Sequence, residues 1–539
     1  MFKSGHIDSF TRDRLPVDAD WPDLVFDLPE LQYPERLNCA ATLLSGAIEQ
    51  GFAGRPAILW DGGAWTYREL DQLSNRIAQV LAADWGLVAG ERVLLRGGNS
   101  AMLIAIWYGV LKAGGVMVTT MPMLRMPELA TIIGKAQVRL ALCEDNLLVE
   151  MQRLPNGKDT GLQLFSFGSD TGDLEQALAG KHNTFEPCNT AQDDVALLAF
   201  TSGTTGEPKA CMQFHRDVLA MADTYARHIL KPKDADVFCG SPPIAFTFGL
   251  GAIVVFPARF GAAAALPSAP GPEALLQTIE RHKVSMLFTA PTAYRALLDL
   301  VGGRDITSLR ACVSAGETLP AATWHAWEKA TGLRLMDGIG ATEMIHIFIS
   351  AKREDVRPGF TGKVVPGYQA CLLDEAGNIL TPPAEGRLAV KGPTGCRYLA
   401  DDRQTSYVVG GWNVTGDTYR QGADGWFSFV ARSDDMIVSS GYNIGGPEVE
   451  EALLSHPTVK ECAVVGEPCE KRGMIVKAYI VTNAEQNGTL VKSLQEHVKN
   501  TIAPYKYPRA IEFMGSLPKT QTGKLQRYKL RSHRLAKKA

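Results

Sequence analysis

The feature that most constrains this chain of 539 residues is an apolar run that ends abruptly in a glycine-rich loop. Residues 195–200 have the composition of a buried strand, and Thr-Ser-Gly-Thr-Thr-Gly-Glu-Pro-Lys follows at 201–209. Backbone N–H groups of such a loop can converge on an anion, hydroxyls add neutral donors, and glycine permits close approach. Lys209 adds a mobile positive charge. We therefore predict a phosphate-binding loop formed by Thr201, Ser202, Gly203, Thr204, Thr205 and Gly206.

The spacing of this loop differs from that of a Walker A loop, which requires G-x-x-x-x-G-K-[ST] at the start of a helix. Gly203 and Gly206 are too close together, and Pro208 stands where that helix would begin. A flexible surface linker of Ser, Thr and Gly is the alternative interpretation. Attachment to a buried strand and the closing Pro-Lys pair favour phosphate binding.

Strands and helices alternate along the first two thirds of the chain, which is typical of a mostly parallel α/β sheet. A capping box at Thr66-Tyr-Arg-Glu69 precedes a helical apolar face, and a strand at 92–96, a helix at 101–112 and a strand at 116–119 follow. Beyond residue 368 the strands become short and are separated by Gly, Pro, Asn and Asp. We predict an α/β, multi-domain protein: an N-terminal domain of stacked α/β sheets at 1–432, with a β-rich subdomain at about 368–432, a hinge at 433–435, and a small, mobile α+β C-terminal domain at 436–539.

Composition excludes several classes of protein. The fractions of 45% hydrophobic and 21% charged residues are those of a soluble globular protein. A net charge of −3 lacks the basic excess that is typical of nucleic-acid-binding proteins. Ten scattered cysteines without C-x-x-C pairs indicate reduced thiols, so we expect a cytoplasmic protein. The N-terminus has no apolar signal-peptide region, and Lys112, Pro257 and Arg259 interrupt the most apolar segments, so we expect no membrane association.

Two further strand-to-loop turns carry chemically useful residues. Ser314-Ala-Gly-Glu317 and the segment from Asp337 to Glu343 both follow apolar runs and contain glycines. Each alone is typical of an ordinary turn. Together with the loop at 201–209 they supply a nucleotide slot, a hydroxyl for a phosphate and a carboxylate for a hard cation.

The loop at 201–209 resembles the signature of the acyl-adenylating superfamily, which includes acyl-CoA and aryl-CoA ligases, luciferases and peptide-synthetase adenylation domains. Further matching motifs follow in the family order, at 337–343, 415–417, 424–435 and 518–527, so the resemblance runs from about residue 66 to Lys524. It implies that a carboxylate and ATP give acyl-AMP and pyrophosphate, with Mg²⁺. CoA then takes the acyl group, after the C-terminal domain has rotated.

The resemblance also implies a role for each matching residue. Thr342 would meet the α-phosphate, Glu343 would hold Mg²⁺, and Lys209 would neutralise pyrophosphate. Lys524 would orient the attacking carboxylate, where an ammonium offsets the repulsion between two anions. The remaining implied residues are Ala315, Gly316, Glu317, Asp337, Gly338, Ile339, Asp417 (at the ribose) and Arg432 for the nucleotide, Asp434 for the hinge, and Ser440, Gly441, Tyr442, Arg472 and Lys506 for CoA.

The acid substrate is predicted from a stretch of aromatic and small residues. These residues would form a flat apolar slot for a benzene ring, with His346 and Thr247 as polar partners for a ring substituent. The alternative is that the aromatics are plain core. Residues 10–41 resemble 2-aminobenzoate (anthranilate)–CoA ligases, so anthranilate is the predicted acid, with benzoate and other small aryl acids as alternatives. The predicted lining comprises Phe246, Thr247, Phe248, Gly340, His346 and Ile347.

Two other classes of function compete with a ligase that uses free CoA. A peptide-synthetase adenylation domain would load a carrier-protein thiol and would place an Asp in the pocket, which the stretch around Phe246 lacks. A non-catalytic nucleotide-binding protein would be expected to have lost Lys524 or Glu343, and both are present. A monomer and a homodimer are equally compatible with the sequence.

Overall fold

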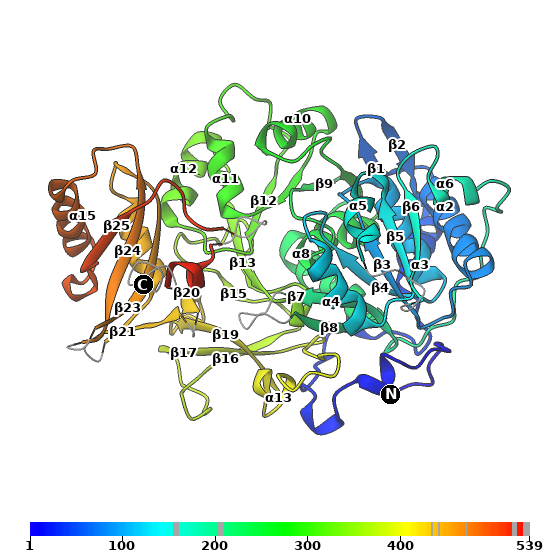
Figure 1. Cartoon of the computed structure of the whole chain (residues 1–539), viewed down its shortest axis with the longest axis horizontal. Helices are drawn as coiled ribbons and strands as arrows, with labels where there is room; N and C mark the ends of the chain where they lie inside the picture. The colour runs from blue at the N-terminus through cyan, green and yellow to red at the C-terminus, as the bar shows by residue number, and fades with distance from the viewer. Residues whose placement is uncertain are drawn as a thin grey trace.

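Two largely parallel sheets form the frame of the N-terminal part of the chain (Figure 1). The computed structural model describes residues 1–154, 161–201, 208–432, 435–439, 442–469, 472–519 and 525–531. One sheet is parallel except at its edge, where β8 returns antiparallel to β7. It comprises, in spatial order, β6 (Gln163–Phe167), β5 (Leu140–Glu144), β3 (Arg92–Arg96), β4 (Val116–Thr120), β7 (Val195–Thr201) and β8 (Lys209–Phe214).

The second sheet is parallel through its centre and antiparallel at its edges. Its parallel core runs from β1 to β13, while β2, β14 and β15 are antiparallel to their neighbours. The spatial order is β15 (Lys363–Val364), β14 (Ile347–Ser350), β13 (Leu335–Gly340), β12 (Ala311–Ala315), β11 (Met286–Thr289), β9 (Val237–Gly240), β10 (Ala263–Ala265), β1 (Pro56–Trp60) and β2 (Gly63–Thr66).

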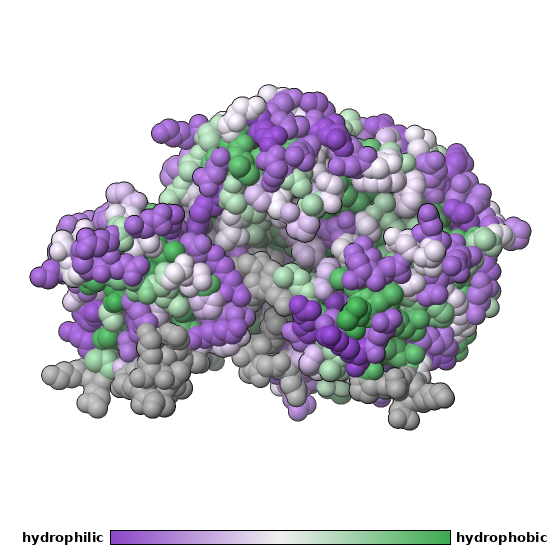
Figure 2. All heavy atoms as spheres, turned by 45° about the horizontal axis from the view of Figure 1, so that its top comes forward, coloured by the Kyte–Doolittle hydropathy of each residue, from purple (hydrophilic) through white to green (hydrophobic). Residues whose placement is uncertain are grey.

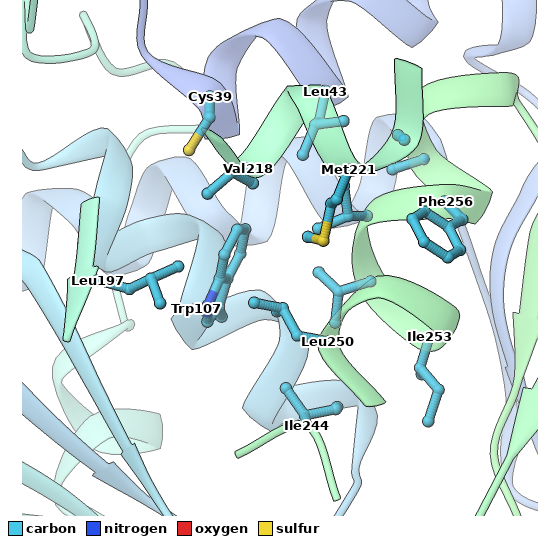
Figure 3. Packing of buried hydrophobic residues seen from close by; sticks show 14 of the residues in the cluster. Cys39, Leu43, Trp107, Leu197, Val218, Met221, Ile244, Leu250, Ile253 and Phe256 are labelled. Atoms are coloured by element: carbon cyan, nitrogen blue, oxygen red, sulfur yellow. The ribbon is translucent and has the colours of Figure 1, made fainter. Parts of the chain in front are cut away.

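A layer of helices is packed between the two sheets and forms the main core. Strand residues alternate between faces, so Val93 and Leu95 join this inner cluster while Leu94 joins the outer one. Figure 3 shows Trp107, Leu197 and Leu250 converging in the inner layer. The inner helices are α1 (Cys39–Ala47), α2 (Tyr67–Gln79), α3 (Ala101–Lys112), α7 (His215–Met221), α8 (Thr247–Leu250) and α9 (Phe256–Phe260), with π-helical turns η7 (Ala222–Leu230) and η8 (Gly251–Val255).

Helices also cover the outer faces, which places the two sheets in a five-layer arrangement. Helix α4 (Met126–Ala136) packs on the outside of the six-stranded sheet. The outside of the nine-stranded sheet is covered by α10 (Pro272–His282), α11 (Pro291–Leu298) and α12 (Ala321–Thr331). Two short helices, α5 (Leu148–Gln152) and α6 (Asp173–Ala177), follow strands β5 and β6.

Two smaller sheets complete the chain. The first is antiparallel and comprises β16 (Gln369–Leu373), β17 (Ala384–Lys391), β18 (Val408–Val409), β19 (Trp412–Gln421) and β20 (Phe427–Arg432), with α13 (Gln404–Tyr407) before β18. The second comprises β21 (Ile437–Ser439), β22 (Tyr442–Ile444), β23 (Val459–Cys469), β24 (Gly473–Thr482) and β25 (Ala510–Phe513). Helices α14 (Gly446–Leu454) and α15 (Gly488–Thr501) contribute to its core, and Glu451 of α14 accepts a hydrogen bond from the first backbone N–H of α12, at 3.2 Å.

The secondary structure predicted from the sequence is confirmed at several places. Thr66 and Glu69 form the predicted capping box at the start of α2, and the predicted strand at 195–200 is β7. The strand predicted at 116–119 is β4, one residue longer. The domain boundaries and the hinge stay predictions, and Asp434 lies outside the described residues.

Hydrophilic residues cover most of the face seen in Figure 2, and hydrophobic ones reach it in scattered areas. All ten cysteines are free thiols. Within the described ranges, every helix is too short or too polar to cross a membrane.

Candidate active site

Strands β12 and β13 bring two of the predicted nucleotide-binding segments to one edge of a sheet. They are parallel neighbours in register, with Ala315 opposite Gly338, so the chain leaves both strands on the same side. Gly316, the first residue after β12, has φ +89°, a conformation that favours glycine. Glu317 beside it accepts a hydrogen bond from the backbone N–H of Thr292, at 3.3 Å.

The two sheets meet along β8. Gln213 Nε2 donates to the carbonyl oxygen of Thr342 at 2.8 Å, which ties β8 to the 3-10 turn Thr342–Met344 beyond β13. Lys209 Nζ donates to the Tyr398 hydroxyl at 2.9 Å, and this hydroxyl donates to Glu343 Oε1 at 2.5 Å. The ammonium and Glu343 Oε1 are 3.9 Å apart. The predicted phosphate-binding lysine and the predicted cation-binding carboxylate therefore belong to one network.

The donor chemistry at Glu343 fits a magnesium ion. Mg²⁺ is usually held by one or two carboxylates together with substrate phosphates and water. Glu343 is 7% exposed, and among the described residues its Oε1 is paired while Oε2 makes no hydrogen bond. The described ranges contain no cluster of three or more His, Cys, Asp or Glu suited to a metal.

A hairpin presents the predicted ribose residue. Asp417 on β19 lies opposite Arg432 on β20, and Arg432 Nη1 donates to Asp417 Oδ1 at 3.0 Å. Gly416 has φ +75°, and a Cβ there would lie 3.2 Å from Arg432 Nη2, so glycine allows the guanidinium to lie along the strand. The structure thus places these two predicted nucleotide-binding residues in direct contact.

Burial changes the acidity of Asp337. Loss of solvent raises the pKa of Asp337 to about 7, although hydrogen bonds from the Gly338 main chain and the Thr361 side chain oppose the shift. The carbonyl oxygen of Asp337 accepts a hydrogen bond from Ser350 Oγ at 2.6 Å. A carboxyl with this pKa changes charge near neutral pH.

Of the predicted aryl-binding aromatics, Phe248 lies beside His346, together with two aromatic residues that were not predicted. His346 is 2% exposed, and its ring lies 4.7 Å from the Phe256 ring, 5.4 Å from Tyr225 and 5.8 Å from Phe248, centroid to centroid. Burial lowers the pKa of His346 to about 3, so the ring is neutral. The Phe248 main chain opposes this shift, yet neither ring nitrogen has a hydrogen bond of acceptable geometry among the described residues.

Close backbone approaches hold this group in place. A Cβ on Gly340 would lie 2.8 Å from the His346 main chain, so glycine lets β13 and β14 pair closely after the turn. Ile347 on β14 is buried, and Phe246 and Thr247 stand at the start of α8. Phe248, one residue further, is half-buried and packs on Phe288 at 5.8 Å.

The predicted CoA-binding residues are only partly described. Tyr442 is exposed and stacks on Tyr505 at 4.5 Å. Lys506 is buried and forms an ion pair with Glu448 at 2.6 Å, so it already serves the packing of its own domain. Arg472 lies exposed between β23 and β24. The predicted residues outside the described ranges are Ser202, Gly203, Thr204, Thr205, Gly206, Asp434, Ser440, Gly441 and Lys524.

Sequence analysis missed Tyr398 and Gln213. Tyr398 is 55 residues from Glu343 along the chain, and Gln213 lies 129 residues before Thr342. Neither residue stands in a pattern that would indicate these contacts, because both contacts depend on how the sheets pack.

Comparison with known proteins agrees with this arrangement. Residues 47–398 match the family model described as AMP-binding enzyme, and residues 448–524 match that of the AMP-binding enzyme C-terminal domain. The chain belongs to the AMP-binding enzyme family. It is an AMP-forming ligase of the CoA-ligase type, as the sequence resemblance implied.

The relatives include ligases for aromatic acids. The benzoate–CoA ligase of Thauera aromatica is 36% identical over 515 residues, which cover 94% of this chain and 97% of that protein. The crystal structure of the anthranilate CoA ligase AuaEII in complex with anthranoyl-AMP has a TM-score of 0.89 at 32% identity and covers 95% and 100% of the two chains. A benzoate CoA ligase from Burkholderia xenovorans LB400 has a TM-score of 0.82 at 30% identity, with 92% and 99% covered.

Proposed function

We propose that this ligase joins an aromatic carboxylic acid to CoA, and that the acid is anthranilate. In the first step the carboxylate attacks the α-phosphate of ATP, forming acyl-AMP and releasing pyrophosphate. In the second step the CoA thiol attacks the acyl carbon, forming the thioester and releasing AMP. Support for an aromatic acid comes from the benzoate and anthranilate ligases among the similar proteins.

We assign the residues of the site to the two steps according to the charges that each step requires. Thr342 and Lys209 would contact the phosphates, with Lys209 offsetting the charge that builds on departing pyrophosphate. Mg²⁺ bound at Glu343 would supply further charge neutralisation. Lys524 would hold the attacking carboxylate and the α-phosphate together, and rotation about Asp434 would replace it with the segment around Tyr442 for the second step.

His346 carries the proposal for anthranilate. An amine next to the carboxylate needs a polar partner, because an unpaired buried donor costs about 1–3 kcal/mol. His346 is neutral, lies beside Phe248 and has ring nitrogens with no partner among the described residues, so it offers an acceptor within an otherwise aromatic cluster. Thr247, buried at the start of α8, is the second candidate partner.

The test is a competition assay of pyrophosphate release with anthranilate, benzoate, a fatty acid and an α-amino acid. We expect anthranilate to have the highest kcat/KM. Preference for benzoate would still support an aryl-CoA ligase, but one that acts on benzoate instead of anthranilate. The 36% identical relative favours this alternative. Preference for the fatty or amino acid would refute the aromatic slot. Discharge of acyl-AMP by free CoA separates this function from the loading of a carrier protein.

A further inference from the structure

Tyr398 lies on a short segment that runs beside strand β8. It forms an isolated antiparallel bridge with Cys211, and backbone hydrogen bonds of 2.7 and 2.9 Å tie the flanking residues to the same strand. Its own N–H donates to Gln404 Oε1 at 2.9 Å. The residue is 1% exposed. Main-chain pairing and burial therefore fix the direction in which the hydroxyl points.

The direction of each hydrogen bond at this hydroxyl follows from the chemistry of its neighbours. The Lys209 ammonium can only donate, so the hydroxyl accepts a hydrogen bond there and donates one to Glu343 Oε1. In this network the phenol is therefore the donor and the Glu343 carboxylate is the acceptor.

The main chain of Glu343 is held by other groups. Gln213 binds the carbonyl oxygen before it, and Thr394 Oγ1 donates to the Met344 carbonyl oxygen at 2.9 Å. Ile345 has φ +62°, which is a strained conformation for a β-branched residue. Since the main chain of the turn is held in this way, the Glu343 side chain is the part that can still change conformation. Tyr398 donates a hydrogen bond to its carboxylate.

We propose that Tyr398 is a positioning residue that holds the Glu343 carboxylate ready for the nucleotide's cation and separates it from Lys209. Without the hydroxyl, an ammonium and a carboxylate only 3.9 Å apart are free to pair directly. That pair would occupy both groups that the phosphates and the cation need. The inference rests on the proposed role of Glu343 as the cation ligand.

The test measures Mn²⁺ binding by electron paramagnetic resonance in the presence of a non-hydrolysable ATP analogue. Tyr398→Phe should weaken Mn²⁺ binding about 10–100-fold, the range for losing a group that orients a metal ligand. Tyr407→Phe is the matched control. The Tyr407 ring packs edge-on against Tyr398 at 5.8 Å, and its buried hydroxyl has no partner among the described residues, so binding should be unchanged.

Two more variants separate the possible failures. Glu343→Gln should abolish Mn²⁺ binding, and adding Lys209→Met to Tyr398→Phe should restore part of the lost affinity by removing the competing ammonium. Wild-type affinity in Tyr398→Phe, with loss in Glu343→Gln, would overturn the role of Tyr398 alone. Wild-type affinity in Glu343→Gln would overturn the cation assignment itself.

Folding is checked by thermal unfolding of every variant. If Tyr398→Phe does not fold, Tyr398→Met, which also removes the hydroxyl, gives the test, with Tyr407→Met as its control. Mn²⁺ affinity should be about 10–100-fold lower in Tyr398→Met than in Tyr407→Met. Equal affinities in the two variants would overturn the proposal.

Discussion

The proposed site has a phosphate side around Lys209 and Glu343 and an aryl side around His346. The two sides differ in how their polar side chains are hydrogen-bonded. On the phosphate side Lys209, Tyr398 and Glu343 bond to one another where two sheets meet. On the aryl side His346 lies among aromatic rings without a hydrogen-bond partner in the described part of the chain. Under the proposed function, the first arrangement would preorganise charge for chemistry common to all substrates, whereas the second would leave a group that only the correct substrate satisfies.

Lys524→Ala should have the largest effect and should act on the phosphate side alone. We expect acyl-AMP formation to fall about 10²–10³-fold, the range for losing one electrostatic donor. The loss should be the same for anthranilate and benzoate, and thioester formation from supplied aryl-AMP should survive. Pyrophosphate release and thioester assays measure the two steps. Different losses for the two acids would contradict the idea that Lys524 acts on the phosphate side independently of the aryl side.

Asp417→Ala should have the next largest effect. Losing a charged hydrogen-bond acceptor of about 1.5–3 kcal/mol should raise the KM for ATP roughly 10–100-fold, equally for both acids. Asp424→Ala is the control, since Asp424 is an exposed carboxylate near the same hairpin that pairs with Arg357 at 2.6 Å. An unchanged KM for ATP in Asp417→Ala would refute the ribose contact.

His346→Ala should affect the aryl side only. We expect kcat/KM for anthranilate to fall roughly tenfold while that for benzoate changes little, because only the amine loses a partner. The pKa of His346 is about 3, so the ratio of the two values in the wild type should be constant between pH 6 and 9. Thr247→Val tests the second candidate. Equal losses for both acids in both variants would refute the amine contact.

Asp337→Asn should have the smallest effect and bears on stability. The folded-state pKa of about 7 exceeds the usual value of 3.8, so the folded protein binds more protons than the unfolded chain between these pH values. The free energy of unfolding should therefore fall as pH rises from about 4 to 7, by less than about 1.4 kcal/mol per pH unit for a half-buried group. Denaturant unfolding at several pH values should show a weaker fall in the variant. An identical slope would refute the shift.

The local elements of the fold were predictable because their signals are short. The capping box at Thr66 and Glu69 needs only a hydroxyl and a carboxylate three residues apart. Strand β7 was predicted from its continuous apolar run, which is typical of a strand buried on both faces. Cysteine spacing likewise predicted the free thiols that the structure shows.

Sequence motifs indicate which residues belong to the candidate site, and their roles stay predictions, but the motifs do not indicate the contacts between these residues. The motifs identified Lys209 and Glu343, and the structure shows that a tyrosine joins them. For Lys506 the resemblance implied a contact with CoA, which stays a prediction, and the structure shows an ion pair with Glu448. Predictions on Lys524 and Asp434 remain open to experiment.

The sequence by itself determined many of the elements, the family motifs and the residue types that are predicted to bind phosphate. These features depend on hydrogen bonds and side-chain patterns that span only a few consecutive residues, so the sequence of a short segment is enough to predict them. Only the tertiary structure decided that Tyr398 lies between Lys209 and Glu343, and that His346 is buried without a partner among the described residues. Both facts arise from the packing of two sheets on one helical layer, which brings together segments that have no relation along the chain.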